Sequence, residues 1–243
     1  MPVTLDVLLS PNDASCVSLS LRTIAPHRAE CLALTGGLAV ELHMAAAGRE
    51  SSPRQLNDID FIADSFEALP RTLGSALLFR HVHPNDPPGK LFLQAVDSKT
   101  NLRIDFFRAY GFEMKRSVPV EIGGLKLRMV SLEDMIARHA RLNWDLIEGR
   151  RTPAKFARDF QRMVELIPSV DIQDIWQEHR KPEMPEDFQL AASLISHAIE
   201  MHGDLLSEPG HSQDLSAICA RCKALEDYPL ADPKQILSIL GYC

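Results

Sequence analysis

The spacing of hydrophobic residues along the chain changes near residue 130. Before it, short apolar runs that alternate with polar residues predict strands, because successive side chains of a strand face opposite sides. After it, apolar residues recur every three or four positions, the spacing of one helix face. The predicted strands are 31–35, 59–63, 76–82, 91–96, 102–107, 118–122 and 125–130. We therefore predict an α/β domain with a mixed sheet over 1–130 and an all-helical domain over 131–243.

Turn and capping residues support this division. The turn-rich segment 97–101 is suited to joining two antiparallel strands, and Gly123-Gly124 is typical of a tight hairpin. Past the boundary, Ser131 stands where it can cap a helix whose first turn carries acids, and Thr152-Pro153 is placed to start the next helix. Further helices are predicted over 172–179, 185–202, 213–226 and 233–240.

Composition and charge narrow the class of protein. The chain has 243 residues, of which 45% are hydrophobic and 24% charged, so it can bury a core like an ordinary globular protein. A formal charge of −7 argues against indiscriminate binding to nucleic acid or to an anionic membrane. No apolar run approaches the ~18 residues of a membrane span, and the first residues lack the layout of a secretory signal. We expect a cytoplasmic protein with no membrane partner.

The five cysteines do not form an evident disulfide framework, because their number is odd. Cys219 and Cys222 have the spacing of a zinc knuckle, but no second pair follows at a finger-like interval. Cys243, His211 and His202 could complete a site only through the fold. Since the two thiols are three residues apart in a helical pattern, we expect them to be metal-free packing residues.

Three aspartates carry the chemistry of the first domain. Asp58 and Asp60 face the same side of one predicted strand, and Asp105 lies in a second apolar run. Carboxylates on one side of a strand repel each other, and a divalent cation between them is the usual remedy. The alternatives are solvated acids at a strand edge or, for Asp105, compensation by an arginine. Three arginines could take that role: Arg54, Arg103 and Arg108.

A glycine pair stands about twenty residues before these acids. Gly36 and Gly37 follow an apolar run that ends in Thr35, and a helix is predicted over 38–47. Glycines let the backbone approach a ligand closely, and the positive end of a helix attracts phosphate. A plain turn without a ligand is the alternative.

Positive charge gathers early in the second domain. Between residues 138 and 162 there are seven arginines and lysines against three acids. Such charges commonly solvate helix surfaces. The functional alternative is that Arg138, Arg141 and Lys155 hold a triphosphate.

Taken in order, these segments resemble the nucleotidyltransferase superfamily whose head is like DNA polymerase beta. The matching residues are 35–40 (Thr-Gly-Gly-Leu-Ala-Val), 58–61 (Asp-Ile-Asp-Phe) and Asp105. Segments 131–138 and 150–159 look like the abortive-infection type, which comprises bacterial toxins and their relatives. The resemblance covers roughly residues 30–165.

The chain also departs from that pattern. Leu38 stands where many members have a serine that touches phosphate, and Leu56 where a serine or threonine usually precedes the two acids. No lysine lies near Arg138 or His139, and Phe156 replaces the acid that tends to follow the lysine. These departures concern the nucleotide-holding half more than the metal-holding half.

The resemblance implies an enzyme that depends on Mg²⁺ or Mn²⁺ and moves a nucleoside monophosphate from an NTP, ATP included, to an acceptor. Asp58, Asp60 and Asp105 would be catalytic and would hold the metals. Nucleotide binding would fall to a set of six residues: Thr35, Gly36, Gly37, Arg138, Arg141 and Lys155. The acceptor stays open among RNA, a protein side chain and a small molecule.

Two other functions compete with this hypothesis. The head could be catalytically silent and bind a protein partner, as one half of a toxin–antitoxin-like pair. A metal-dependent phosphohydrolase could use the same acids, but it would be expected to add histidine ligands. Only His81 and His83 are candidates for that role.

Overall fold

The computed structural model describes residues 4–27, 29–49, 56, 58–65, 68–82 and 92–207. Contacts within the chain divide it into two compact units, with a boundary between Val130 and Ser131. The helices predicted over 213–226 and 233–240, together with the Cys219/Cys222 pair, lie outside the described residues. The predicted domains over 1–130 and 131–243 stay predictions.

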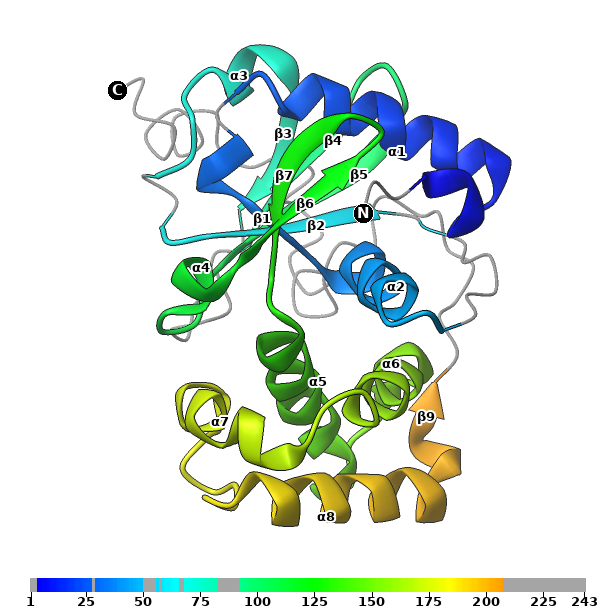
Figure 1. Ribbon diagram of the computed structural model, residues 1–243, viewed down its shortest axis with the longest axis vertical. Coiled ribbons are helices and arrows are strands. Elements are labelled where there is room, and N and C mark those ends of the chain that lie inside the picture. Colours follow the sequence, from blue (N-terminus) through cyan, green and yellow to red (C-terminus); the bar gives the residue numbers. More distant parts are fainter. Residues whose placement is uncertain are drawn as a thin grey trace. The chain divides into compact units, whose positions relative to one another are not determined.

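Among the described residues of the first unit, seven strands form one mixed sheet in the order β3-β4-β5-β2-β1-β7-β6 (Figure 1). The strands are β1 (Ala33–Thr35), β2 (Asp58–Ala63), β3 (Leu78–Val82), β4 (Phe92–Asp97), β5 (Leu102–Arg108), β6 (Val118–Ile122) and β7 (Leu125–Met129). The pairs β1/β7 and β2/β5 are parallel, and the other neighbours are antiparallel. Each predicted strand overlaps an observed one, which confirms the mixed α/β class.

Helices accompany the sheet in this unit (Figure 1). They are α1 (Pro11–Ile24), α2 (Gly36–Ala46), α3 (Leu73–Ala76) and α4 (Glu113–Arg116), with 3₁₀ turns at Leu5–Val7 and Ala29–Cys31. Helix α1 packs against β5 and α2 against β2. The predicted helix over 38–47 corresponds to α2, whereas α1 was not predicted. Its start is capped by Ser10, whose hydroxyl accepts from the Asp13 amide at 3.3 Å.

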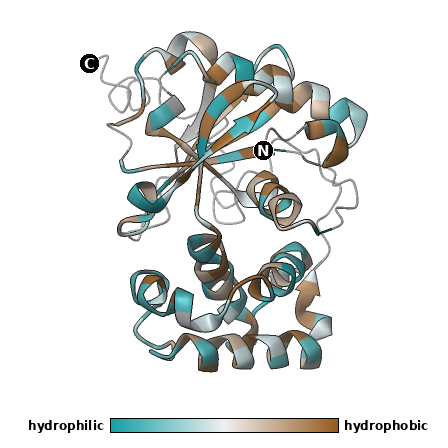
Figure 2. Cartoon of the chain, viewed as in Figure 1, coloured by the Kyte–Doolittle hydropathy of each residue, from teal (hydrophilic) through white to brown (hydrophobic). Residues whose placement is uncertain are grey.

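The alternation of β2 and β5 separates an apolar face from a polar one. Ile59, Phe61, Ile104 and Phe106 are fully buried, and the two phenylalanine rings stack with centroids 5.8 Å apart. Figure 2 shows hydrophobic and hydrophilic residues interleaved along the strands. Because successive side chains of a strand face opposite sides, the intervening polar residues share the other face of the sheet.

The second unit is built around α5 (Leu132–Ile147), which packs against α6 (Ala154–Val164), α7 (Gln173–His179) and α8 (Phe188–Met201) (Figure 1). Smaller elements are the 3₁₀ turns Ser169–Ile172 and Gly203–Leu205 and the two-residue strands β8 (Thr152–Pro153) and β9 (Leu206–Ser207). The region is therefore mainly, not entirely, helical, and α6 begins two residues after the predicted Thr152. In the part of the chain that the structure describes, no helix combines the length and the apolar character needed to cross a membrane.

Buried polar contacts fix the start of α5. Ser131 caps the helix as predicted: its hydroxyl accepts from the Asp134 amide at 3.1 Å and donates to the Asp134 carboxylate at 2.7 Å. The other Asp134 oxygen lies 2.9 Å from His179 Nε2, and neither side chain is exposed. This network joins the first turn of α5 to the end of α7, so we assign Ser131, Asp134 and His179 a structural role.

Candidate functional site

Four polar residues form a row across the polar face of the sheet. Thr35 of β1 lies opposite Asp60 of β2, Asp60 opposite Asp105 of β5, and Asp105 opposite Gln94 of β4. The backbone register continues from Gln94 to His81 of β3. The His81 side chain and all of His83, the histidines that a phosphohydrolase would need, lie outside the described residues.

The structure brings the three predicted acids together. Asp58 lies two residues before Asp60 on β2 and therefore on the same face. One carboxylate oxygen from each of Asp58, Asp60 and Asp105 lies within 4.8 Å of the others. The Asp105 and Asp58 side chains are only 9% and 17% exposed. Three poorly hydrated carboxylates at this separation need a positive partner.

Arg103 supplies part of that positive charge. It lies opposite Asp58 in the strand register, where its Nη2 atom contacts Asp58 Oδ2, and its Nε atom is 3.2 Å from Asp105 Oδ2. Burial by itself lowers the pKa of the guanidinium, but attraction by Asp105, Asp58 and Asp60 raises it, and the net shift is upward. Of the candidate arginines that the structure describes, Arg103 is thus the compensating one. Arg108 is exposed at the other face of β5, and Arg54 lies outside the described residues.

Gln94 holds Asp105 from the opposite side. Its amide nitrogen donates to Asp105 Oδ1 at 3.0 Å, and the whole residue is 1% exposed. Among the described residues its amide oxygen is buried without a hydrogen-bond partner, an arrangement that costs free energy and that proteins usually avoid. Sequence reasoning missed Gln94. The available signal was one amide inside the apolar run 91–96, which has no meaning until the strand register places it beside Asp105.

Gly36 lies directly against the acids. Its φ of +63° is a conformation that other residues rarely adopt, and a Cβ atom built there would be 1.8 Å from Asp60 Oδ2. Only glycine fits this position. Helix α2 begins at Gly36, so its positive end starts beside the Asp60 carboxylate. Thr35, the preceding residue, is 3% exposed.

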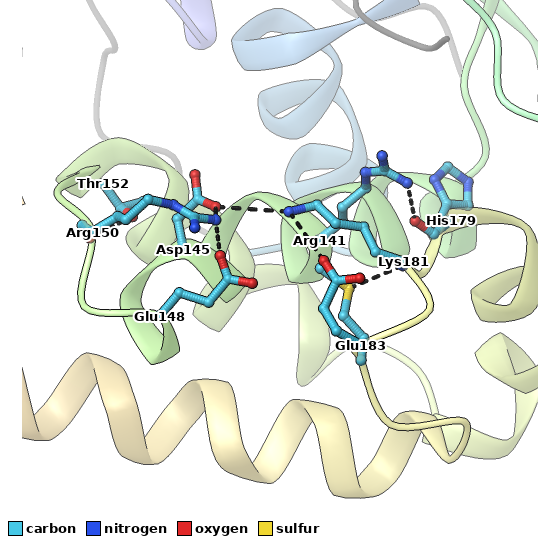
Figure 3. Close-up of polar contacts among 9 residues, drawn as sticks. Arg141, Asp145, Glu148, Arg150, Thr152, His179, Lys181 and Glu183 are labelled. Carbon is cyan, nitrogen blue, oxygen red and sulfur yellow. Dashed lines mark hydrogen bonds and ion pairs between the residues drawn. The ribbon is translucent and has the colours of Figure 1, made fainter. Parts of the chain in front are cut away.

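The predicted nucleotide-binding cations belong to the second unit. Arg138 and Arg141 are half-buried on α5, and Lys155 is half-buried on α6. Arg141 Nη1 donates to the His179 carbonyl at 2.6 Å, as Figure 3 shows, and the Lys155 ammonium lies 5.4 Å from the centroid of the Phe156 ring. Their role in nucleotide binding stays a prediction.

Other basic side chains of this unit are paired with nearby acids (Figure 3). Arg150 contacts both Asp145 and Glu148. The Lys181 Nζ atom lies 4.0 Å from Asp145 Oδ1 and 3.8 Å from Glu183 Oε1. The Arg150 side chain is 51% exposed. These ion pairs at the surface fit the interpretation that basic residues of this region solvate helix surfaces instead of binding a triphosphate.

The chemistry of the acid cluster suits a hard divalent cation. Carboxylate oxygens are the ligands that Mg²⁺ and Mn²⁺ prefer, and Gln94 holds the Asp105 carboxylate through its amide nitrogen. The three acids and Arg103 together carry a formal charge of −2, which one divalent cation balances. We conclude that Asp58, Asp60 and Asp105 fit such an ion.

Comparisons with known proteins add a likeness of fold. No protein-family model matches the chain, and no curated protein matches it in sequence. An antigenic nucleotidyltransferase-like protein from Paracoccidioides brasiliensis is similar at a TM-score of 0.46 and 15% identity, over 82% of this chain and 92% of that one. The antibiotic-resistance factor ANT(2'')-Ia is similar at 0.45 and 15%, over 77% and 97%. Both are similarities to this chain at low identity, and the toxin type stays a prediction.

Proposed function

We propose that this chain is a metal-dependent nucleotidyltransferase, which transfers a nucleoside monophosphate from an NTP to an acceptor and releases pyrophosphate. The observation that carries the proposal is the convergence of Asp58, Asp60 and Asp105 on one sheet face, beside the start of α2. In-line displacement at phosphorus depends on charge neutralisation at the attacking and leaving oxygens. Acids on adjacent strands can hold a metal cation beside those two oxygens.

Each residue has a defined task in this proposal. Asp58, Asp60 and Asp105 would hold Mg²⁺ or Mn²⁺, which would supply Lewis-acid activation of the acceptor oxygen and neutralise phosphate charge. The hydrogen bonds between β2 and β5 fix Asp60 and Asp105 opposite each other, so the two carboxylates are in position before the substrates react. Gly36 and Gly37 begin α2, and the backbone amides at this positive end of the helix would bind phosphate oxygens.

A catalytically silent binding module is the second candidate, and a specific observation favours it. Arg103 already pairs with two of the three acids. Leu38 and Leu56, the two departures nearest the acids in sequence, are 1% and 6% exposed, so both contribute to the core instead of offering a hydroxyl to phosphate. A silent module would bind a protein partner and leave NTP unchanged.

One assay separates the two candidates. The full chain is incubated with each α-labelled NTP and Mg²⁺ or Mn²⁺, alone and with total RNA, a protein mixture or small hydroxyl-bearing acceptors. We expect label transfer and pyrophosphate release that stop with EDTA and in Asp105→Asn. The matched control is Asp64→Asn, which removes the same charge from an exposed position after β2. No NTP consumption under any condition would favour the silent module.

The toxin type is a finer part of the proposal and needs its own test. Overproduction of an active toxin-type transferase in a bacterial host is expected to arrest growth, and Asp105→Asn is expected to relieve the arrest. Equal growth with both forms, in the presence of measured transfer activity, would remove the toxin role and leave the reaction class in place.

A further inference from the structure

Arg103 occupies a specific position within the acid cluster. It stands two residues before Asp105 on β5 and directly opposite Asp58 on β2, so its side chain shares their face of the sheet. One guanidinium therefore reaches two acids from different strands, Asp58 through Nη2 and Asp105 through Nε. With 31% of its side chain exposed, Arg103 is partly shielded from the water and salt that would screen these contacts.

Asp105 is engaged on both of its oxygens. Oδ2 lies 3.2 Å from Arg103 Nε in an ion pair that lacks hydrogen-bond geometry, and Oδ1 accepts a hydrogen bond from Gln94 at 3.0 Å. Gln94 is held there although its own amide oxygen is buried without a partner, which indicates that the fold accepts a cost to keep this carboxylate in place. The cluster is thus preorganised around a cation that the chain itself provides.

The Arg103 guanidinium is part of the chain, so it cannot leave the acid cluster as a bound metal ion can. A guanidinium stays protonated in proteins, so the positive charge that Arg103 places beside Asp58 and Asp105 is permanent. A divalent cation bound by Asp58 and Asp105 must therefore share them with a fixed positive charge a few ångströms away. Repulsion at that range is substantial at the effective dielectric constant of a protein surface.

We propose that Arg103 is a built-in counter-cation that limits the affinity of the acid cluster for divalent metal. The inference rests on the proposed function, because it takes the three acids as the metal ligands. Arg103 is a positioning residue in this account: it acts through Asp58 and Asp105. It stabilises the metal-free protein, where three carboxylates would otherwise repel one another, and it weakens metal binding by the same contacts.

The experiment measures Mn²⁺ binding to the full chain by isothermal titration calorimetry. Arg103→Gln should lower the Kd for Mn²⁺ by at least about tenfold relative to wild type, because a nearby charge is removed from a weakly screened site. Arg108→Gln is the matched control. It removes the same charge from the same strand, at an exposed position on the other face, and should keep the wild-type Kd.

Thermal unfolding of the same proteins gives a second readout. In EDTA, Arg103→Gln should melt below wild type, and saturating Mn²⁺ should raise its melting temperature by more than it raises that of wild type. If Arg103→Gln folds only with Mn²⁺ present, the proposal is supported in its strongest form. A general structural role would lower stability without tightening metal binding.

A third measurement needs no destabilised variant. Mg²⁺ titrated into isotope-labelled wild type should shift the Nε–H resonance of Arg103, assigned by its loss in Arg103→Lys, as Asp105 becomes shared with the ion. An unmoved resonance in a protein that binds Mg²⁺ would overturn the inference, and so would an unchanged or raised Kd in Arg103→Gln. Both of those results leave the proposed function intact. Absence of Mn²⁺ binding in both wild type and Arg103→Gln would instead contradict the proposed function itself.

Discussion

The two units concentrate charge in different ways. In the first, three acids and Arg103 share one face of a sheet, and the Asp58 and Asp105 side chains are largely shielded from water. In the second, Arg150 lies between Asp145 and Glu148 at the surface, with half of its side chain exposed. A cluster of acids that is shielded from water is suited to binding a cation, whereas exposed ion pairs contribute little.

The supporting backbone differs as well. A strand ladder fixes Asp60 opposite Asp105, and each of these side chains has two rotatable bonds. The paired cations Arg150 and Lys181, which follow α5 and α7, are long side chains that lose more conformational entropy when they are held. The acid cluster on β2 and β5 is therefore preorganised for a bound ion. The ion pairs around Arg150 and Lys181 keep the surface of the second unit hydrated. Four predictions test this contrast.

Asp60→Asn should give the largest effect, a loss of nucleotidyl transfer of at least about a hundredfold, because it removes a ligand from the reacting centre. Its melting temperature should stay within about 2 °C of wild type or rise slightly, since the variant relieves repulsion in the metal-free cluster. Initial rates and thermal unfolding check both parts. A large drop in stability would assign Asp60 a structural role and break the comparison.

Gly36→Ala should lower the free energy of unfolding by at least about 2 kcal/mol. The new Cβ would meet Asp60 Oδ2 at 1.8 Å in a backbone conformation with φ +63°. Gly149→Ala is the control, because Gly149 has φ +71° with nothing within 4 Å, and it should cost only about 1 kcal/mol. Equal losses in urea unfolding would mean that the contact with Asp60 does not constrain this turn.

Arg141→Ala should destabilise the protein by about 1.5–3 kcal/mol, because a charged donor to the buried His179 is lost. Arg150→Ala should change stability by less than about 0.5 kcal/mol, since exposed ion pairs contribute little. Chemical denaturation of both variants measures the difference. A cost for Arg150→Ala as large as that for Arg141→Ala would show that the surface network is structural after all.

Lys155→Ala should have the smallest effect on stability and should raise the KM for NTP several-fold, if the predicted role of Lys155 in triphosphate binding holds. Arg151→Ala removes the same charge from an exposed position nearby and should leave the KM unchanged. Steady-state kinetics with the NTP identified in the labelling assay provides the measurement. The same KM in Lys155→Ala and wild type would place Lys155 with the solvating charges.

The strands and acids could be predicted because short-range rules determine them. The alternation around Asp58 and Asp105 and the turn residues between strands are local signals, and observed bounds differ from predicted ones by a few residues. Helix α1 was missed because its serine-rich sequence has a weak apolar stripe, although Ser10 and Pro11 marked its start.

Partners across the sheet could not be predicted in the same way. The sequence offered Arg54, Arg103 and Arg108 as compensating cations. Alternation along β5 places Arg103 on the face of Asp105, but only the parallel register of β2 with β5 brings it opposite Asp58. The same holds for Gln94, which reaches Asp105 through the antiparallel pairing of β4 with β5. Register between distant strands is a tertiary property, so local periodicity does not contain it.

The central claim is that the acid cluster binds a divalent cation, and anomalous X-ray scattering from crystals grown with Mn²⁺ and a non-hydrolysable NTP analogue tests it most directly. We predict an anomalous peak within about 2.5 Å of carboxylate oxygens from at least two of Asp58, Asp60 and Asp105, and no such peak in Asp60→Asn. A wild-type map without Mn²⁺ at these acids, with Arg103 still paired to Asp58 and Asp105, would contradict the account.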